Sequence, residues 1–278
     1  MKTWILPLLL LLPAARAAAG GPAAPPQEPA AAAGFDHAYR LWGEILRDYV
    51  HPGGLVDYAG LKRRDRAKLQ KVLRGMQSVY RRQYQGWTEN QKMAFWINAY
   101  NAWTVDLIVR NHPVDSIKDL GGLFSSVFSK EFVPLNHLVP GFDDPLSLGE
   151  IEHEILGKRF PSPMFHFAIV CASRSCPELR DEPYRPEVLG RQLEEQARSF
   201  LADPAKNDQE VRGGVLRVSR IFDWSEDELE RFPGGIRGLL KRYGPPRVAS
   251  HPDLGKVRLR YRDYDWSLNE WKPEPGSR

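Results

Sequence analysis

The stretch from Thr88 to Ile108 constrains the fold of this chain more than any other, because nearly every face of it is apolar. Thr88 followed three residues later by Gln91 is the pattern of a capping box, which predicts that a helix begins here. Aromatic and aliphatic side chains then occupy most positions through Ile108, and a helix that is apolar all round has to be buried. We therefore expect a long central helix, against which the rest of the chain packs.

Two asparagines interrupt the apolar surface of this expected helix. Asn98 and Asn101 are poor helix formers, and an amide side chain is costly to bury without a hydrogen-bond partner. Each of them could bond a neighbouring backbone group, or one of them could orient a catalytic side chain. Both alternatives stay open at this point.

Apolar spacing and turn residues predict the other elements of the chain. Helices are expected at 35–49, 61–84, 147–156 and 186–201 and from 225 onwards. Extended pieces are expected at 55–58, 132–133 with 137–139 as a small hairpin, 165–170 as a buried strand, 211–218 as a hairpin, and 257–261. The fold class that these elements indicate is α+β, a single helix-rich domain with a small, mostly antiparallel sheet.

The first residues have the pattern of a targeting segment. Lys2 precedes a mostly leucine run at 5–12 and an A-x-A cleavage pattern at 15–17, so residues 1–17 are predicted to be a signal peptide. The run is too short to cross a bilayer, so we expect no stable membrane span after cleavage, with an uncleaved anchor as the alternative. The protein is expected to be exported, to a periplasm or outside the cell, where cysteines can oxidise.

The composition of the remaining residues indicates the domain boundaries and limits the classes of partner that we expect. Residues 18–33 are rich in Ala, Gly and Pro and are predicted to be a linker, followed by a domain at 34–272 and a tail at 273–278. Hydrophobic residues (42%) and charged residues (27%) are balanced as in globular proteins. The net charge of +4 falls to +2 without Lys2 and Arg16. No basic run alternates with exposed aromatics, so we expect no nucleic-acid partner.

Both cysteines lie in one segment, at 171 and 176, directly after the predicted strand at 165–170 and before Pro177. A reactive side chain at the mouth of a buried strand is held rigidly and can reach solvent. The pair has three interpretations: a local disulfide, worth at most roughly 2 kcal/mol by loop entropy; a nucleophile; or two buried, inert thiols. A zinc site would need two histidines in addition, and a spacing of five is not typical of one.

A cysteine nucleophile needs a base, and a histidine oriented by a third polar group is the usual one. His153 and His166 are the nearest histidines in sequence, and Glu152, Asn98 or Asn101 could orient the base. Glu152 and His153 are neighbours on a helix and point about 100° apart, so they cannot easily bond each other. Backbone N–H groups of residues 172–175 would form the oxyanion hole. This chemistry needs no cofactor.

Five segments of the chain, taken in order, resemble the DUF547 family, a domain of unknown function. They are VDYAGL (56–61), FWINAYNAWTV (95–105), SLGEIEHEIL (147–156), HFAIVCASRSCPELR (166–180) and DYDWSLN (263–269). The resemblance covers roughly residues 35–270 and implies a similarity to papain-like cysteine hydrolases. It implies motif roles for Asn98, Asn101, Glu152, His153, Cys171 and Ser175. Plant-type members resemble this chain more at the first cysteine than at the second, which favours Cys171 over Cys176.

These observations lead to one main functional hypothesis and two alternatives. The main hypothesis is an exported cysteine hydrolase or acyl transferase acting on peptide or amide bonds, with Cys171 as nucleophile, His153 as base, and Glu152, Asn98 or Asn101 as the orienting group. The first alternative is a non-catalytic binding module of the cell envelope. The second is a redox-responsive protein that uses Cys171 and Cys176 as a reversible pair. The expected partner is a peptide-like or cell-envelope ligand.

Overall fold

The structure of the chain is a computed structural model that describes residues 34–122 and 126–273. From Phe35 onwards the chain forms one compact unit. The predicted signal peptide (1–17) and linker (18–33) lie outside the described residues, as does the tail beyond Pro273. Within the part of the chain that is described, no helix is long and apolar enough to cross a membrane.

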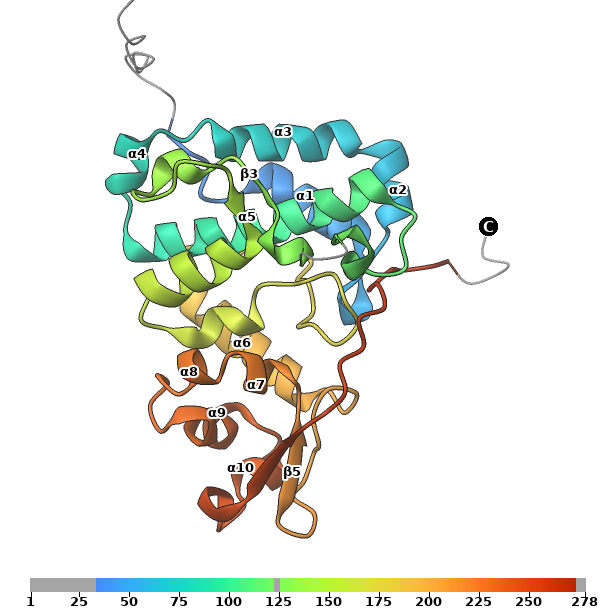
Figure 1. Cartoon of the computed structure of the whole chain (residues 1–278), viewed down its shortest axis with the longest axis vertical. Helices are drawn as coiled ribbons and strands as arrows, with labels where there is room; N and C mark the ends of the chain where they lie inside the picture. Colours follow the sequence, from blue (N-terminus) through green and yellow to red (C-terminus); the bar gives the residue numbers. More distant parts are fainter. Residues whose placement is uncertain (1–33, 123–125, 274–278) are drawn as a thin grey trace, which may run out of the picture. The chain divides into compact units, whose positions relative to one another are not determined.

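The central helix predicted from the apolar run is confirmed as α5, Glu89–Asn111. The Thr88 hydroxyl accepts the Gln91 N–H, and the Gln91 side chain accepts the Thr88 N–H at 2.8 Å, so the capping box is complete. Every residue from Met93 to Val109 is buried. The helix therefore runs through the core, as its composition requires (Figure 1).

Helices of the first half of the unit surround α5. They are α1 (Arg40–Tyr49), α2 (Tyr58–Arg64), α3 (Arg66–Gln77) and α4 (Arg81–Gln85). Of these, α2, α3 and α4 contact α5, and α1 packs on α2 and α3. The expected helix at 35–49 begins later, because Tyr39 has a left-handed backbone (φ 50°). The prediction of one helix over 61–84 is wrong: the backbone of Asp65 is not helical, and its carboxylate accepts the Tyr49 hydroxyl at 2.8 Å.

Strands are short and paired two by two in the described residues. They are β1 (Val50–His51), β2 (Leu55–Val56), β3 (Glu131–Val133), β4 (Leu146–Ser147), β5 (Val215–Val218) and β6 (Arg258–Tyr261). The pairs β1–β2 and β3–β4 are antiparallel, and β5–β6 is parallel. The α+β, helix-rich class is therefore confirmed. The hairpin predicted between 132–133 and 137–139 is wrong, because β3 pairs with β4 and Asn136–Leu138 forms a 3-10 turn.

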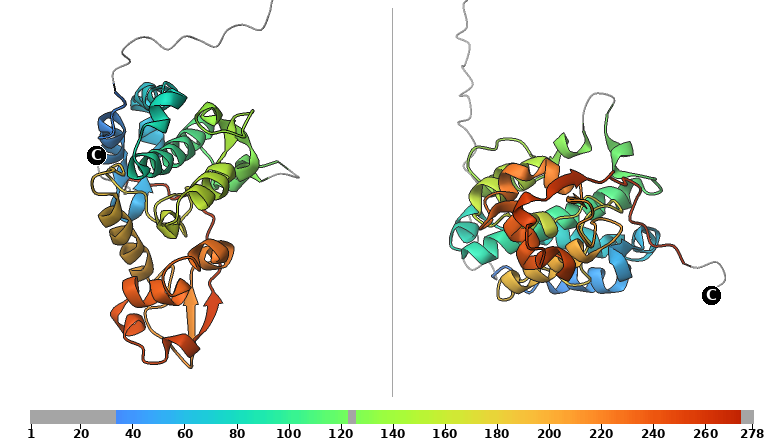
Figure 2. Two further views of the ribbon diagram at one scale, coloured as in Figure 1. Left: turned by 90° about the vertical axis from the view of Figure 1, so that its left-hand side faces the viewer. Right: turned by 90° about the horizontal axis from the view of Figure 1, so that it is seen from below.

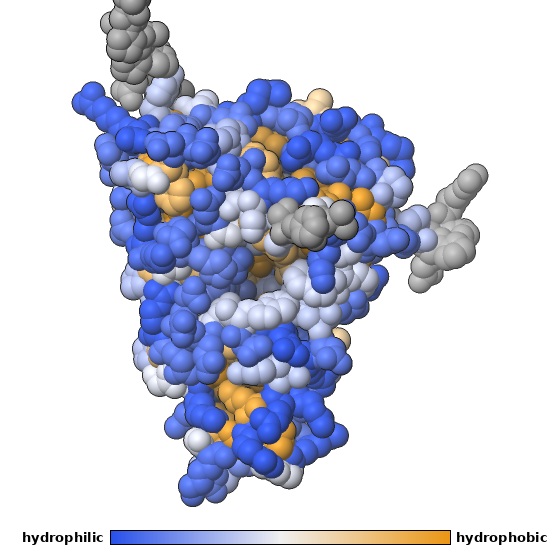
Figure 3. All heavy atoms as spheres, in the orientation of Figure 1, coloured by the Kyte–Doolittle hydropathy of each residue, from blue (hydrophilic) through white to orange (hydrophobic). Residues whose placement is uncertain are grey.

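The second half of the unit gathers its helices around β5 and β6, at the lower end of Figure 1. These helices are α6 (Leu189–Ala202), α7 (Ile221–Trp224), α8 (Glu226–Leu229), α9 (Gly235–Tyr243) and α10 (Pro246–Ala249). The predicted turn at Gly213–Gly214 is present, closed by two hydrogen bonds between Arg212 and Val215. Figure 3 shows a mostly hydrophilic face here, with apolar atoms between the polar ones near β5 and β6.

The segment before the cysteines is not the predicted buried strand. Pro163–Phe167 forms a 3-10 helix, and the chain continues without regular structure to the cysteine turn. The apolar run is buried as expected, but the side chain of Asn101 on α5 accepts the Val170 N–H and donates to the Ala168 carbonyl, each at 2.9 Å. A side chain thus takes the place of a neighbouring strand. The helix predicted at 147–156 is a π-helix, Glu150–Gly157.

A C-terminal strap, residues 262–271, returns from β6 past the cysteine turn to β1 and β2 (Figures 1 and 2). Ser267 accepts the Arg174 N–H at 2.9 Å, and Asn269 donates its N–H to Ala172 at 3.1 Å. The Asn269 side chain then bonds the Gly54 carbonyl and the Tyr58 hydroxyl. The strap therefore joins the two halves of the unit at the cysteine turn.

Candidate functional site

A cavity of about 240 Å³ lies beside the cysteine turn. Its walls come from α5, the π-helix, the segment 166–177, α7 and the C-terminal strap. The polar and sulfur-bearing residues that line it are Tyr100, Glu152, His153, His166, Cys171, Cys176, Ser225 and Tyr264. The cavity therefore collects three of the five predicted catalytic residues (Cys171, His153 and Glu152) into one place.

A buried histidine–carboxylate pair forms one side of the cavity. The Nδ1 atom of His166 lies 3.6 Å from Glu152 Oε1 and 3.3 Å from the Ser225 hydroxyl. The second Glu152 oxygen accepts the Tyr100 hydroxyl at 3.3 Å. The Nε2 atom of His166 is buried, with no hydrogen-bond partner in the described part of the chain. One ring nitrogen therefore faces a carboxylate and a hydroxyl, and the other has no partner in the described residues.

The electrostatics of Glu152 follow from this pairing. Burial by itself would raise the pKa of the Glu152 carboxyl, but the hydrogen bond and charge of His166, with smaller contributions from His153 and Tyr100, outweigh it. The pKa of Glu152 therefore lies below its ordinary value. An ionised Glu152 carboxylate faces the Nδ1 side of the His166 ring, where it favours an N–H directed at it.

The second histidine of the cavity stands in a different environment. The side chain of His153 is 51% exposed, and its Nδ1 lies 3.3 Å from Glu228 Oε1 on α8. Glu152 and His153 point to different partners, as expected for adjacent residues of a helix. His153, the base predicted from the sequence, therefore lines the cavity, but its side chain is exposed and is paired with Glu228.

The two cysteines are joined in a disulfide, and within the described residues neither thiol is free. Cys171 is partly exposed and Cys176 is buried. The Tyr264 hydroxyl lies 3.3 Å from each sulfur, and Ser173 Oγ lies 3.0 Å from Cys171 Sγ. Burial raises the pKa of Tyr264, so its hydroxyl keeps a proton to donate. Polar donors therefore surround the sulfurs.

The turn after Cys171 has an unusual backbone. Ala172 has φ 58°, one of two non-glycine residues with positive φ in the described residues. A left-handed alanine costs roughly 1–2 kcal/mol, and such strain is often found at functional sites. The N–H groups of Arg174, Ser175 and Cys176 are bonded to carbonyls. Of the predicted oxyanion hole at 172–175, only the N–H groups of Ala172 and Ser173 are therefore left for a ligand.

The two buried asparagines of α5 bond backbone, not an imidazole. Asn101 bridges Ala168 and Val170, as described above, and Asn98 accepts the Tyr184 N–H at 3.1 Å and donates to the Tyr184 carbonyl at 2.7 Å. Both amides are therefore used by the chain on either side of the cysteine turn. The structure therefore contains the first of the two alternatives for these residues, and the groups beside His166 Nδ1 are Glu152 and Ser225.

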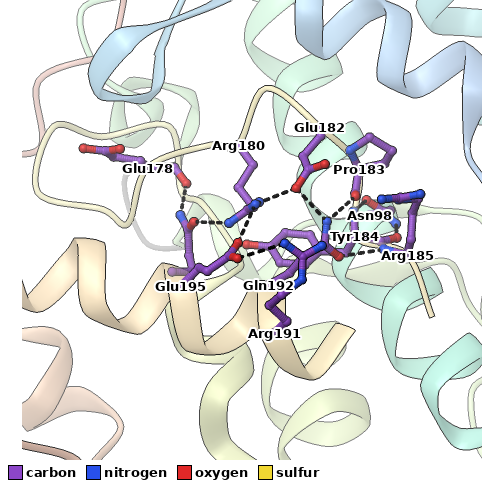
Figure 4. A network of polar contacts seen from close by, with 11 residues as sticks. Asn98, Glu178, Arg180, Glu182, Pro183, Tyr184, Arg185, Arg191, Gln192 and Glu195 are labelled. Carbon is purple, nitrogen blue, oxygen red and sulfur yellow. Dashed lines mark hydrogen bonds and ion pairs between the residues drawn. The ribbon is translucent and has the colours of Figure 1, made fainter. Parts of the chain in front are cut away.

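A polar network holds the chain that follows the cysteine turn (Figure 4). Arg180 donates to Glu182 at 2.5 Å and to Glu195 of α6 at 3.1 Å. Gln192 of α6 also donates to Glu182, at 3.0 Å. With the Asn98–Tyr184 bonds, this network fixes the segment 178–185 between α5 and α6. The turn at 171–176 is therefore anchored on both sides.

Sequence reasoning missed several residues of the cavity. Trp224, Ser225, Tyr264 and Trp266 come from α7 and the strap, and only their place in the fold brings them to the cysteines. The motif DYDWSLN contains Tyr264 and Trp266, and it is the one feature of the sequence that pointed to any of these residues. In the part of the chain that is described, no group of three histidine, cysteine or acidic side chains could hold a metal ion.

The fold and the cavity define an α+β protein with a cysteine pair beside a buried histidine–carboxylate pair. The family model described as "Protein of unknown function, DUF547" matches residues 84–201, which include α5, the π-helix, the cysteine turn and α6. Residues 84–201 therefore match the DUF547 family, as the motifs in this segment suggested. Comparisons with curated proteins and with solved structures find no significant match.

Proposed function

We propose that this protein is a cysteine hydrolase or acyl transferase in which Cys171 is the nucleophile and His166 is the base. The observation that carries the proposal is the placement of His166: its Nδ1 faces Glu152, its Nε2 has no partner in the described residues, and His166 and Cys171 line one cavity. A carboxylate, an imidazole and a thiol in this order form a catalytic triad in unrelated folds. His166 therefore replaces His153 as our preferred base.

The proposed reaction transfers an acyl group through Cys171. The imidazole of His166 takes the thiol proton, and the Cys171 sulfur attacks the carbonyl carbon of an amide or ester. The carbonyl π electrons move to the oxygen and return as the bond to the leaving group breaks, and His166 gives its proton to that group. Water or an acceptor amine then attacks the thioester, losing its proton to His166, and the C–S bond breaks to regenerate the thiol.

The disulfide has to be opened before this chemistry can begin. Two equivalents of a thiol reductant convert the Cys171–Cys176 bond into two thiols and become a disulfide themselves. The oxidised form is then an inactive state of the same site. We include export in the proposal because the N-terminal sequence pattern favours it and an oxidising compartment permits the disulfide.

The test is to trap the acyl group on the enzyme. Protein reduced with dithiothreitol and then freed of it is mixed with N-acetylglycine p-nitrophenyl ester, and the acylated peptide is identified by mass spectrometry. We expect one acyl group on Cys171, released by neutral hydroxylamine as a thioester would be. Cys171→Ser is expected to remove the adduct, and unreduced protein should not form it.

Two results would overturn the proposal. One is the absence of any adduct on Cys171 in protein whose thiols titrate as fully reduced. The other is an equal rate of adduct formation in His166→Asn, since the imidazole would then have no part in activating the sulfur. A protein that binds ligands equally well after Cys171→Ser and forms no adduct would be a binding module.

The disulfide itself favours a second candidate function, a redox-responsive protein. Cys171 is the more exposed sulfur, and Cys176 is buried and accepts the Tyr264 hydroxyl and the Cys171 N–H (2.8 Å), which would stabilise a departing Cys176 thiolate. A partner dithiol would attack Cys171, release Cys176, and leave as a disulfide. Rapid, reversible reduction by a physiological dithiol protein, with no acyl adduct under reducing conditions, would favour this function.

A further inference from the structure

Trp224, at the end of α7, is the only large apolar side chain that is exposed in the described residues, with 49% of its surface accessible. Single exposed apolar side chains are common on proteins and need no explanation by themselves. Trp224 differs because it belongs to a cluster of three rings beside the cysteine cavity. We call this cluster, formed by Trp224, Tyr264 and Trp266, the aromatic wall.

The three rings are in mutual contact. Their centroids lie 4.7 Å apart for Trp224 and Tyr264, 4.6 Å for Tyr264 and Trp266, and 5.6 Å for Trp224 and Trp266. These are the separations that favourable aromatic pairs adopt. Two segments distant in sequence, α7 and the strap, therefore meet through these ring contacts.

The aromatic wall is held in place from behind. The Trp266 carbonyl accepts the Ser116 hydroxyl at 2.8 Å, and the Lys118 ammonium lies 5.1 Å from the centroid of the Trp266 ring. The Tyr264 hydroxyl accepts the Ser173 hydroxyl at 3.2 Å. A ring surface fixed in this way can bind a planar group without ordering itself first, which lowers the cost of binding.

The aromatic wall is also close to the proposed nucleophile. The Tyr264 hydroxyl is 3.3 Å from Cys171 Sγ, and the Trp224 ring contacts the ring of the same tyrosine. One residue of an extended peptide spans roughly 3.3–3.6 Å. A ligand group that lies on Trp224 is therefore about one or two residues away from a carbonyl at Cys171.

We propose that the aromatic wall is a substrate subsite that binds an aromatic side chain within one or two residues of the carbonyl attacked by Cys171. This inference rests on the proposed function, and it names the class of acyl donor: a peptide or amide bearing an aromatic group. A sugar ring fits less well on the three rings themselves, because its hydroxyls need polar partners and the Tyr264 hydroxyl is already bonded. Apolar residues of the cavity, beside its polar ones, are Phe128, Ile169, Pro177 and Ile221.

The test uses alkylation, which needs an accessible Cys171 thiol but no acyl transfer. Reduced protein is treated with chloroacetamides whose nitrogen carries a benzyl, cyclohexylmethyl or methyl group, and with N-chloroacetylglucosamine. Rates at Cys171 are measured by mass spectrometry and divided by the rates with free glutathione. We expect the benzyl reagent to react roughly tenfold faster than the methyl reagent, with the cyclohexylmethyl reagent in between.

Variants then locate the effect. Trp224→Ala is expected to bring the benzyl-to-methyl ratio close to that of glutathione. Trp271→Ala removes an indole that stacks on His51 outside the cavity, and it should leave the ratio as in the wild type.

Three outcomes would overturn the inference: equal rates for benzyl and methyl reagents, equal rates for benzyl and cyclohexylmethyl reagents, or fastest reaction with the glucosamine reagent. The result is separable from the proposed function. A benzyl preference that is lost in Trp224→Ala, in a protein that forms no acyl adduct, would establish the subsite and contradict acyl transfer. An acyl adduct without a benzyl preference would support acyl transfer and contradict the subsite.

Discussion

Two histidines line the same cavity, each paired with a carboxylate, and the burial of the imidazole distinguishes them. The side chain of His166 is 1% exposed and faces Glu152, whereas that of His153 is 51% exposed and faces Glu228. The two carboxylates are equally exposed, at 21% each, so the difference lies in the histidines. Water screens an exposed imidazole, whereas a buried imidazole with further hydrogen bonds is held in one geometry. Both histidines line the cavity with the cysteines, so this position does not tell which of them is the base. The surroundings of each imidazole make the distinction.

The largest expected effect separates the two histidines directly. His166→Asn should lower the rate of Cys171 acylation in reduced protein by roughly 10²–10⁴-fold, the range for loss of a general base. The matched change His153→Asn should lower it less than about threefold. Stopped-flow release of p-nitrophenol measures both rates. A larger loss in His153→Asn would reverse the comparison and restore His153 as the base.

The next prediction tests whether Asn101 supports the segment that carries His166 and Cys171. Asn101→Ala leaves the Ala168 carbonyl and the Val170 N–H without their partner, at a cost of roughly 1–3 kcal/mol for each group in the free energy of unfolding. Because these groups lie between His166 and Cys171, the acylation rate should fall as well. Urea denaturation and the p-nitrophenol assay give the two quantities.

Asn98→Ala is the matched control for Asn101→Ala, since it likewise removes two hydrogen bonds from the backbone, here that of Tyr184. It should destabilise the protein by a similar amount and leave the acylation rate of the folded enzyme close to the wild type. Equal loss of rate in both variants would mean that α5 supports the whole fold and has no particular role at the cavity.

A third effect concerns pH. Since the pKa of folded Glu152 is lowered, its ionised form stabilises the fold at pH values above its ordinary pKa, and this contribution is lost as the pH falls through the folded-state pKa. Glu152→Gln should cost roughly 1–3 kcal/mol at about pH 7 and less at acidic pH. Urea denaturation of the wild type and of Glu152→Gln, from acidic to neutral pH, measures the difference in their free energies of unfolding. Glu228→Gln is the control, since Glu228 is as exposed as Glu152 but faces the exposed His153. An equal pH dependence in both variants would contradict the contrast.

The smallest effect refines the environment of His166. Ser225→Ala removes a hydroxyl 3.3 Å from Nδ1 and should cost roughly 0.5–1.5 kcal/mol of stability. The acylation rate should change little, because Glu152 still orients the ring. Ser250→Ala, at an exposed serine that bonds Pro246, serves as the control. A loss of rate as large as that of His166→Asn would make Ser225 the orienting group instead of Glu152.

Several features of the fold were predictable because they depend on local sequence. The capping box at Thr88 and the apolar run after it determined where α5 begins and that it is buried. The reciprocal bonds between Ser147 and Glu150 also form as their spacing predicts, with Ser147 N–H to Glu150 at 2.7 Å. Short-range hydrogen bonds and side-chain periodicity act within one turn, so the sequence carries them directly.

The strand predicted at 165–170 failed for a non-local reason. An apolar, β-branched run is equally compatible with a buried strand and a buried irregular segment, and what decides is which group bonds its backbone. Here that group is the side chain of Asn101 on α5, distant by more than sixty positions in the chain. No pattern within the run itself signals such a partner.

By itself the sequence determined the buried central helix, the α+β class, the family resemblance, and the cysteine turn as the place to look for chemistry. The tertiary structure alone decided that Glu152 faces His166, that Asn98 and Asn101 bond backbone, and that Trp224, Tyr264 and Trp266 form one wall. The physical reason is the range of the interactions. Helix caps and apolar periodicity act between neighbours in the chain, whereas a cavity is made by side chains from several segments, and their distances exist only once the core has packed.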